Sequence, residues 1–199
     1  MYKKEEIKKV AIYCASSTKI RPVFFEAADR LGRLFAQNDL HMIYGAGNMG
    51  LMGKMADALI EEGGTMTGVI PQFMVEQGWH HPKCTELIVT EDMANRKTWI
   101  WQHADALVAL PGGIGTLDEL SEILVLKQLG VLTHPIVILN TDGYYDALLV
   151  ALDKMVQEHF LLPLHQDMYK VVRQPEEVLP AILSSERWNG GENLKHAKI

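Results

Sequence analysis

The stretch PGGIGTLDEL, residues 111 to 120, combines a glycine loop with two carboxylates. Gly112, Gly113 and Gly115 allow the backbone to approach a ligand closely, and Thr116 is expected to open a helix directly after them. Because a helix N-terminus carries unpaired N–H groups and a partial positive charge, phosphate is the expected ligand. No lysine follows the last glycine, as it would in a Walker loop, so a monophosphate fits better than a triphosphate with magnesium.

Glu119, in the same stretch, has two interpretations. Thr116 to Glu119 spell T-x-x-E, so Glu119 can complete a capping box by reaching back to the Thr116 N–H. A carboxylate folded onto the helix end would, however, repel a phosphate bound there, and Glu119 could then face the sugar attached to that phosphate. The residues by themselves leave both interpretations open. Asp118 is most simply a first-turn acid that favours the helix dipole.

The first glycine loop along the chain is YGAGNMGLMG at 44 to 53, and PGGIGT is the second. The first loop contains the spacing G-x-G-x-x-G in Gly45, Gly47 and Gly50. Dinucleotide-binding loops share this spacing, but they need an acidic residue about 20 positions on, and residues 69 to 71 are Val, Ile and Pro. NAD binding is therefore disfavoured. The loop either contributes to a substrate site or only allows a strand and a helix to pack closely.

Strand-like apolar runs alternate with helical patterns, which is typical of a parallel sheet covered by helices. Six of the seven expected strands should be buried on both faces, as parallel strands usually are. The strands are expected at 10–14, 40–45, 65–70, 86–90, 106–110, 135–140 and 169–173, and helices from Pro22, around 52–60, 92–103 and 144–158, and from 175 to about 183. Ligands of such sheets bind at the carboxyl ends of the strands, where both glycine loops lie.

The bulk properties favour a single domain over 1–184 and a flexible tail over 185–199, where periodicity is lost. A net charge of −6 gives no general attraction to nucleic acid or anionic lipid, and no apolar run approaches the length of a membrane span. The two cysteines and the absence of a secretory signal indicate a cytoplasmic protein.

The run ILVL at 123–126 is apolar around the whole circumference of a helix, of which a sheet covers only one side. A partner subunit is a plausible cover for the rest, so a homodimer with the glycine-loop site near its interface is expected.

Two smaller groups of polar residues each have a functional and a simpler structural interpretation. His80, His81 and Cys84 spell H-H-x-x-C, but no second cluster completes a metal site, so a partly exposed loop is favoured and no metal is expected. Ser16 and Ser17 follow the first strand and could donate to a substrate, although a cap for the next turn is the favoured interpretation.

Together these motifs resemble the Lonely Guy family of cytokinin riboside 5′-monophosphate phosphoribohydrolases, long mislabelled as lysine decarboxylases. The resemblance covers about three quarters of the chain. It rests on CASS (14–17), YGAGNMGLMG (44–53), GGTMTGVIP (63–71), MANRK (93–97), ADALVALPGGIGTLDEL (104–120), QLG (128–130) and LNTDGYYDALL (139–149). It implies a Rossmann-like three-layer α/β sandwich, usually a homodimer. It also implies that the enzyme needs no cofactor and hydrolyses an adenosine-type nucleoside 5′-monophosphate to free base and ribose 5-phosphate.

The family's catalytic arginine and glutamate fall on Arg96, in M-x-x-R-K, and on Glu119, in P-G-G-x-G-T-x-x-E. An N-glycosidic bond breaks through an oxocarbenium-like sugar, which Glu119 can stabilise while it activates water or forms a covalent intermediate. Arg96 keeps its proton at neutral pH, so it is expected to act as a fixed cation. The candidate substrate-binding residues are Ser17, Gly45, Gly47, Glu76, Met93, Lys97, Gly112, Gly113, Gly115 and Thr116.

The chain departs from the family pattern at several positions. Ala46 occupies a position where the family often has glycine, and Ala94 and Asn95 occupy positions where it commonly has His and Glu. Family members often have Thr and Trp just before the QLG segment, whereas residues 125–127 of this chain are VLK. The change at Val125 and Leu126 allows an alternative function, that of a nucleoside-monophosphate-binding protein with little or no hydrolytic activity. Lysine decarboxylation would require an electron sink such as pyridoxal phosphate, for which the sequence offers no convincing site.

Overall fold

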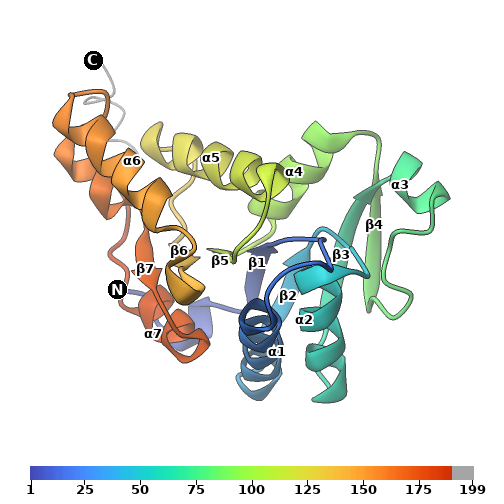
Figure 1. Ribbon diagram of the computed structural model, residues 1–199. Coiled ribbons are helices and arrows are strands. Elements are labelled where there is room, and N and C mark those ends of the chain that lie inside the picture. Colours follow the sequence, from blue (N-terminus) through green and yellow to red (C-terminus); the bar gives the residue numbers. More distant parts are fainter. Residues whose placement is uncertain (190–199) are drawn as a thin grey trace.

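The computed structural model describes residues 1–189, which contain a single seven-stranded parallel sheet in the order β4-β3-β2-β1-β5-β6-β7 (Figure 1). All seven expected strands are confirmed within two residues at either end. Their bounds are β1 Lys9–Tyr13, β2 His41–Tyr44, β3 Met66–Pro71, β4 Glu86–Thr90, β5 Ala106–Ala109, β6 Ile136–Leu139 and β7 Lys170–Val172.

Helices cover both faces of the sheet and make three layers (Figure 1). On one face lie α1 (Pro22–Gln37), α2 (Gly50–Glu61) and α7 (Val178–Leu183); on the other lie α4 (Met93–Gln102), α5 (Ile114–Gln128) and α6 (Asp146–Gln157). Because successive strand residues point to opposite faces, Val10 and Ile12 of β1 pack under the first group and Ala11 and Tyr13 under the second. The expected three-layer α/β fold is confirmed.

Shorter helical segments join these elements. They are α3 (Gln72–Glu76), which the sequence did not predict, and the 3₁₀ turns Lys4–Glu6, Thr141–Gly143, Pro163–Met168 and Pro175–Glu177.

The edge strands differ from the central ones in burial. The residues of β3, β5 and β6 are buried, and so are those of β1 and β2 after their first residue. Every residue of β4 and β7, in contrast, is at least partly exposed. The expectation of six buried strands was therefore wrong for one of them. The apolar run ELIVT resembles a buried strand, but β4 has only one neighbour, so Val89 remains half exposed.

The chain order places a topological switch point between β1 and β5. From β1 the sheet extends through β2, β3 and β4 in one direction and through β5, β6 and β7 in the other. Loops that leave the carboxyl ends of β1 and β5 therefore diverge, and such crevices bind ligands in open α/β sheets. Both glycine loops lie at this end of the sheet (Figure 1).

The expected flexible tail, 185–199, lies mostly outside the described residues. Within the described part, the Trp188 ring nitrogen donates to the Lys127 carbonyl at 2.7 Å and Ser185 donates to the Ala181 carbonyl at 2.8 Å. The tail beyond residue 189 stays a prediction. No helix of residues 1–189 is long and apolar enough to cross a membrane, and the cytoplasmic location also stays a prediction.

Candidate active site

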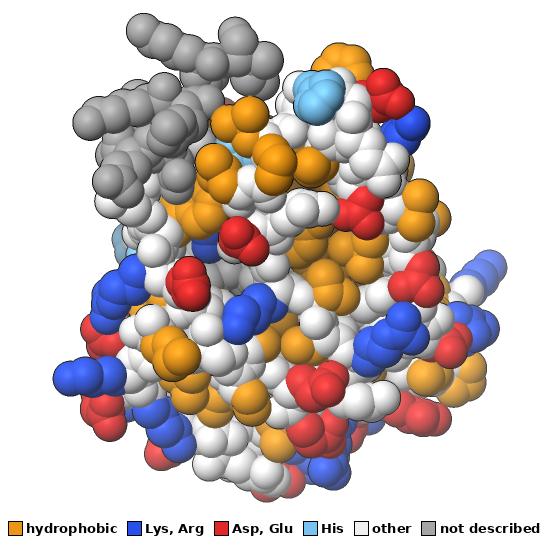
Figure 2. Space-filling view, turned by 90° about the vertical axis from the view of Figure 1, so that its left-hand side faces the viewer, with side chains coloured by type: hydrophobic (Ala, Val, Ile, Leu, Met, Phe, Trp, Pro, Cys, Tyr) orange, Lys and Arg blue, Asp and Glu red, His pale blue; other side chains and the backbone are white. Residues whose placement is uncertain are grey.

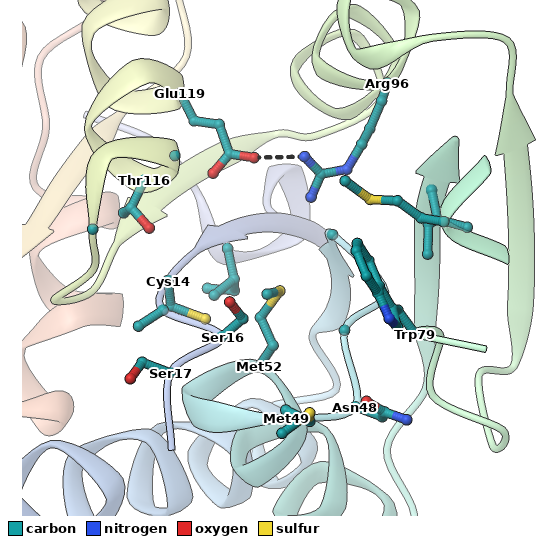
Figure 3. A pocket seen from close by; sticks show the side chains of 18 of the residues that line it. Cys14, Ser16, Ser17, Asn48, Met49, Met52, Trp79, Arg96, Thr116 and Glu119 are labelled. Atoms are coloured by element: carbon teal, nitrogen blue, oxygen red, sulfur yellow. Dashed lines mark hydrogen bonds and ion pairs between the residues drawn. The ribbon is translucent and has the colours of Figure 1, made fainter. Parts of the chain in front are cut away.

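A cavity of about 540 Å³ opens at the carboxyl end of the sheet, a usual size for a small-molecule site. It is lined by parts of five segments: 12–17 at the end of β1 and beyond, 45–52 after β2, 70–79 at the end of β3 and beyond, the first turn of α4 and residues 113–119 at the start of α5. The segments that follow the neighbouring strands β1 and β5 face each other across it (Figure 3). The switch point of the sheet thus contains a formed pocket.

Arg96 and Glu119 form a buried ion pair in the wall of this cavity (Figure 3). Arg96 Nη1 lies 3.0 Å from Glu119 Oε1, and the side chains are only 9% and 11% exposed. Arg96 Nε also donates to the Val69 carbonyl at 3.0 Å, which fixes the orientation of the guanidinium. The two residues that the resemblance named as the catalytic pair therefore lie in direct contact.

Local structure places the arginine of this pair. Asp92 caps α4 by accepting from the Asn95 N–H at 2.7 Å, so Arg96 lies in the first turn of a well-defined helix. Gly45 makes room for it, because a Cβ at that position would lie 1.9 Å from Arg96 Nη2. The first glycine of the G-x-G-x-x-G spacing therefore admits an arginine side chain.

Burial raises the pKa of Glu119 above its usual range, and the neighbouring Arg96 guanidinium opposes this without cancelling it. A carboxylate with a raised pKa is a better proton acceptor than an exposed one, and it retains its negative charge beside Arg96 once deprotonated. Glu119 is thus suited to activate water or to stabilise a cationic sugar.

The capping-box interpretation of Glu119 is wrong, because α5 begins earlier than the sequence indicated. Gly113 is the N-cap, the Leu117 N–H bonds to the Gly113 carbonyl at 3.0 Å, and Thr116 is the third helical residue. Glu119 consequently lies in the second turn and points to Arg96. The N–H groups of residues 114–116 at the helix start have no partner within the helix.

The glycines of the PGGIGT loop have two separate roles. A Cβ at Gly113 or Gly115 would meet nothing within 4 Å, so these two residues leave open space at the helix end. A Cβ at Gly112 would instead lie 2.1 Å from Thr116 Oγ1, and Gly112 does not line the cavity. Gly113, Gly115 and Thr116 remain candidates for phosphate binding, and Gly112 has a packing role.

Of the other candidate substrate contacts, Ser17, Gly47 and Met93 line the cavity, and Lys97 and Glu76 do not. Lys97 forms ion pairs with Asp118 at 3.0 Å and Glu122 at 3.6 Å, so it ties α4 to α5 beside the Arg96–Glu119 pair. This contact also gives Asp118 a partner.

Glu76 is exposed at the end of α3, where it accepts from Gln72 Nε2 at 3.2 Å. This position does not support the prediction that Glu76 binds the substrate.

The HHxxC segment holds no cluster of metal-ligating side chains, and no group of three or more His, Cys, Asp and Glu gathers for a metal within residues 1–189. Buried His81 bonds through Nε2 to Asp57 Oδ1 at 3.1 Å and accepts through Nδ1 from the Lys83 N–H at 3.2 Å. Cys84 lies 3.5 Å from the Tyr44 hydroxyl. These contacts anchor the loop between β3 and β4.

Several cavity residues were not expected from the sequence, namely Cys14, Asn48, Met49, Met52, Met74 and Trp79. The methionines among them carry no polar group that could have marked them as site residues in the sequence. The only signal is that methionine occurs twice in NMGLM, in the first glycine loop. Trp79 follows Gly78 in a loop without periodicity, where a large aromatic side chain has no helix or strand to bury it.

Comparison with known proteins identifies the family of the chain. Residues 52–182 match a family model described as possible lysine decarboxylase. A cytokinin riboside 5′-monophosphate phosphoribohydrolase of Arabidopsis thaliana, LOG5, is 34% identical over 188 residues, which cover 94% of this chain and 82% of the relative. LOG7 of the same plant is 36% identical over 184 residues, 89% of this chain and 85% of the relative. The chain belongs to the Lonely Guy family.

Solved structures with the same fold as this Lonely Guy chain include the molybdenum cofactor carrier protein of Chlamydomonas reinhardtii, with a TM-score of 0.68 and 20% identity over 88% of this chain and 96% of that one. The molybdenum cofactor binding protein of Rippkaea orientalis has a TM-score of 0.67 and 18% identity over 87% and 94%. At such identities these likenesses bear on the fold only, and they agree with the Rossmann-like sandwich.

Proposed function

We propose that this protein hydrolyses the N-glycosidic bond of adenosine-type nucleoside 5′-monophosphates and releases free base and ribose 5-phosphate. The family supports the reaction type, since its plant relatives are named as phosphoribohydrolases. The observation that carries the proposal is the position of Glu119, one turn inside a helix whose open N-terminus faces the same cavity. A phosphate held at that end leaves its sugar beside the carboxylate.

The chemistry follows from these positions. The free N–H groups of residues 114–116 and the helix dipole bind the phosphate, with the Thr116 and Ser17 hydroxyls as further donors. Glu119 then stabilises the oxocarbenium-like sugar and either activates water or forms a covalent intermediate. Arg96, bonded to both Val69 and Glu119, keeps the carboxylate in place and balances its charge.

The alternative, a binding protein without hydrolysis, rested on VLK at 125–127 in place of the family's usual residues. None of these three residues lines the cavity, and the Lys127 amine donates to the His134 carbonyl at 2.7 Å. This departure removes no substrate contact within one subunit, which favours the enzyme over the binding protein.

We also propose that the protein is a homodimer that uses the outer face of α5 and α6. Val125 is 51% exposed, so the apolar circumference of 123–126 is only partly covered within one chain. Leu129, Val131 and Val150 are exposed as well. Figure 2 shows hydrophobic side chains reaching the surface in its upper part, the side on which α6 lies. Light scattering of wild type and Val125→Glu tests this, and a monomeric wild type contradicts it.

A panel of nucleoside monophosphates, with the matching nucleosides as controls, tests the enzymatic proposal. We expect free base and ribose 5-phosphate from AMP or from an N6-substituted AMP, such as the cytokinin riboside 5′-monophosphate for which the relatives are named. Nucleosides should not react, because they lack the group held by α5. Tight AMP binding by calorimetry without base release over hours would support the binding protein instead.

A further inference from the structure

We propose that Trp79 is the residue on which the base of the bound nucleotide stacks, and that it selects purine over pyrimidine monophosphates. This proposal rests on the proposed function for the position of the phosphate. Trp79 lies outside the motifs that define the family resemblance, in the loop between α3 and β4.

The exposure of Trp79 is the first observation. Its side chain lines the cavity, yet the residue is 52% exposed. An indole is large and mostly apolar, so a folded protein ordinarily covers much more of it. A half-exposed tryptophan at a cavity wall leaves an aromatic face available for a planar ligand.

The loop that carries Trp79 is fastened to the first glycine loop. The Asn48 N–H donates to the Trp79 carbonyl at 3.2 Å, and the His81 N–H donates to the Ala46 carbonyl at 2.7 Å. The buried His81 ring, two residues beyond Trp79, bonds to Asp57 on α2. Because these bonds hold the backbone at Trp79 and at His81, the loop loses little conformational entropy when a ligand stacks on the indole.

The positions of the other groups place the base at this end of the cavity. Figure 3 shows Thr116 and the indole of Trp79 on opposite sides, with Glu119 and Arg96 above the space between them. A nucleotide with its phosphate at α5 and its sugar at Glu119 therefore extends its base toward Trp79.

Apart from the neutral amide of Asn48, the lining near Trp79 is largely apolar (Figure 3). Met49, Met52, Met74 and Met93 line the cavity, and its charged lining side chains, Arg96, Asp118 and Glu119, come only from α4 and α5. Thioethers and an indole contact rings by dispersion, without a charged partner for the base. The two fused rings of a purine overlap an indole more fully than the single ring of a pyrimidine does.

Binding to a Glu119→Gln protein, which holds the nucleotide without turnover, tests the proposal. Trp79→Ala should weaken AMP binding about 5- to 150-fold, because a stacked base contributes about 1–3 kcal/mol and 1.4 kcal/mol is a factor of ten. Trp79→Phe should weaken it less. Ribose 5-phosphate, which lacks a base, should bind all three proteins equally. Phe73→Ala, a half-exposed aromatic outside the cavity, is the matched control and should not change AMP affinity.

Two further readouts separate stacking from a structural role. AMP should quench tryptophan fluorescence of the parent protein more than that of Trp79→Phe, and the ratio of AMP to CMP affinity should fall in Trp79→Ala. Unchanged AMP affinity in Trp79→Ala, or an equal loss of ribose 5-phosphate binding, overturns the proposal. If no nucleotide is hydrolysed but Trp79→Ala still loses AMP selectively, the proposed function fails and the stacking role stands.

Discussion

The two glycine loops of this protein differ in what lies against their α-carbons. In the loop after β2, a Cβ at Gly45 would overlap the Arg96 guanidinium, and one at Gly50 would lie 2.4 Å from the Ser16 carbonyl carbon. In the loop after β5, Gly113 and Gly115 face space with no atom within 4 Å. The first loop uses glycine to admit protein atoms, whereas Gly113 and Gly115 of the second leave open space at the start of α5, where we propose that the phosphate binds.

The difference shows that a glycine spacing does not by itself locate a phosphate. The G-x-G-x-x-G spacing has the more familiar form, yet Gly45 serves the arginine of the site and the third glycine lies against the loop after β1. The PGGIGT loop has the less familiar form, but its open residues sit at a helix N-terminus one turn before Glu119. Variants that add a methyl group or remove a charge can test this assignment.

The largest effect is expected from Glu119→Gln. The PGGIGT loop leads into α5, which carries the proposed catalytic Glu119, and loss of a carboxylate that works as an acid–base group typically costs about 10²–10⁴ in rate. Base release from AMP measures it, with circular dichroism to show that the fold survives. Asp118→Asn is the matched control on the same turn and should retain activity within a few fold. A fully active Glu119→Gln protein would remove Glu119 from the mechanism.

Gly45→Ala should damage both stability and activity. The new methyl group would occupy the position of Arg96 Nη2, and overpacking of this kind costs about 1–3 kcal/mol. Displacement of the guanidinium should also slow turnover, since it supports Glu119. Urea unfolding and the rate of base release report the two effects. Unchanged stability of the Gly45→Ala protein would show that the space beside Arg96 is not needed.

Gly115→Ala should have the opposite signature. It lies in the first turn of α5 with open space around it, and alanine favours a helix over glycine by about 1 kcal/mol, so stability should hold or rise. The methyl group should obstruct the phosphate and weaken nucleotide binding about tenfold, equivalent to about 1.4 kcal/mol. Calorimetric binding of ribose 5-phosphate measures this, and unchanged affinity would move the phosphate elsewhere.

The smallest effect concerns pH. Burial raises the pKa of Glu119, and the deprotonated form stabilises the sugar cation, so activity should be present above that raised pKa and lost as pH falls through it. The acid limb of kcat/KM should therefore lie above the ordinary glutamate value of 4.5. Arg96→Met removes the charge that opposes the shift and should move the limb further upward. A limb at or below the ordinary value would contradict this environment for Glu119.

Much of the fold could be predicted because its signals are local. The alternation of VAIYC, ALVAL and PIVILN with amphipathic helices depends only on neighbouring residues, and each of these runs became a strand. The errors occurred where a local signal was ambiguous. ELIVT has the composition of a central strand but lies at an edge, and T-x-x-E resembles a cap although α5 starts two residues before Thr116.

The sequence by itself determined the order of strands and helices and, through its motifs, the family, and it singled out PGGIGT as the candidate phosphate loop and Arg96 and Glu119 as the candidate catalytic pair. The tertiary structure alone decided that Arg96 meets Glu119, that Gly45 makes room for this contact, and that Trp79 faces the same cavity. These residues lie far apart along the chain. Their contacts depend on how whole elements pack across the switch point of the sheet, whereas secondary structure follows from the periodicity within each segment.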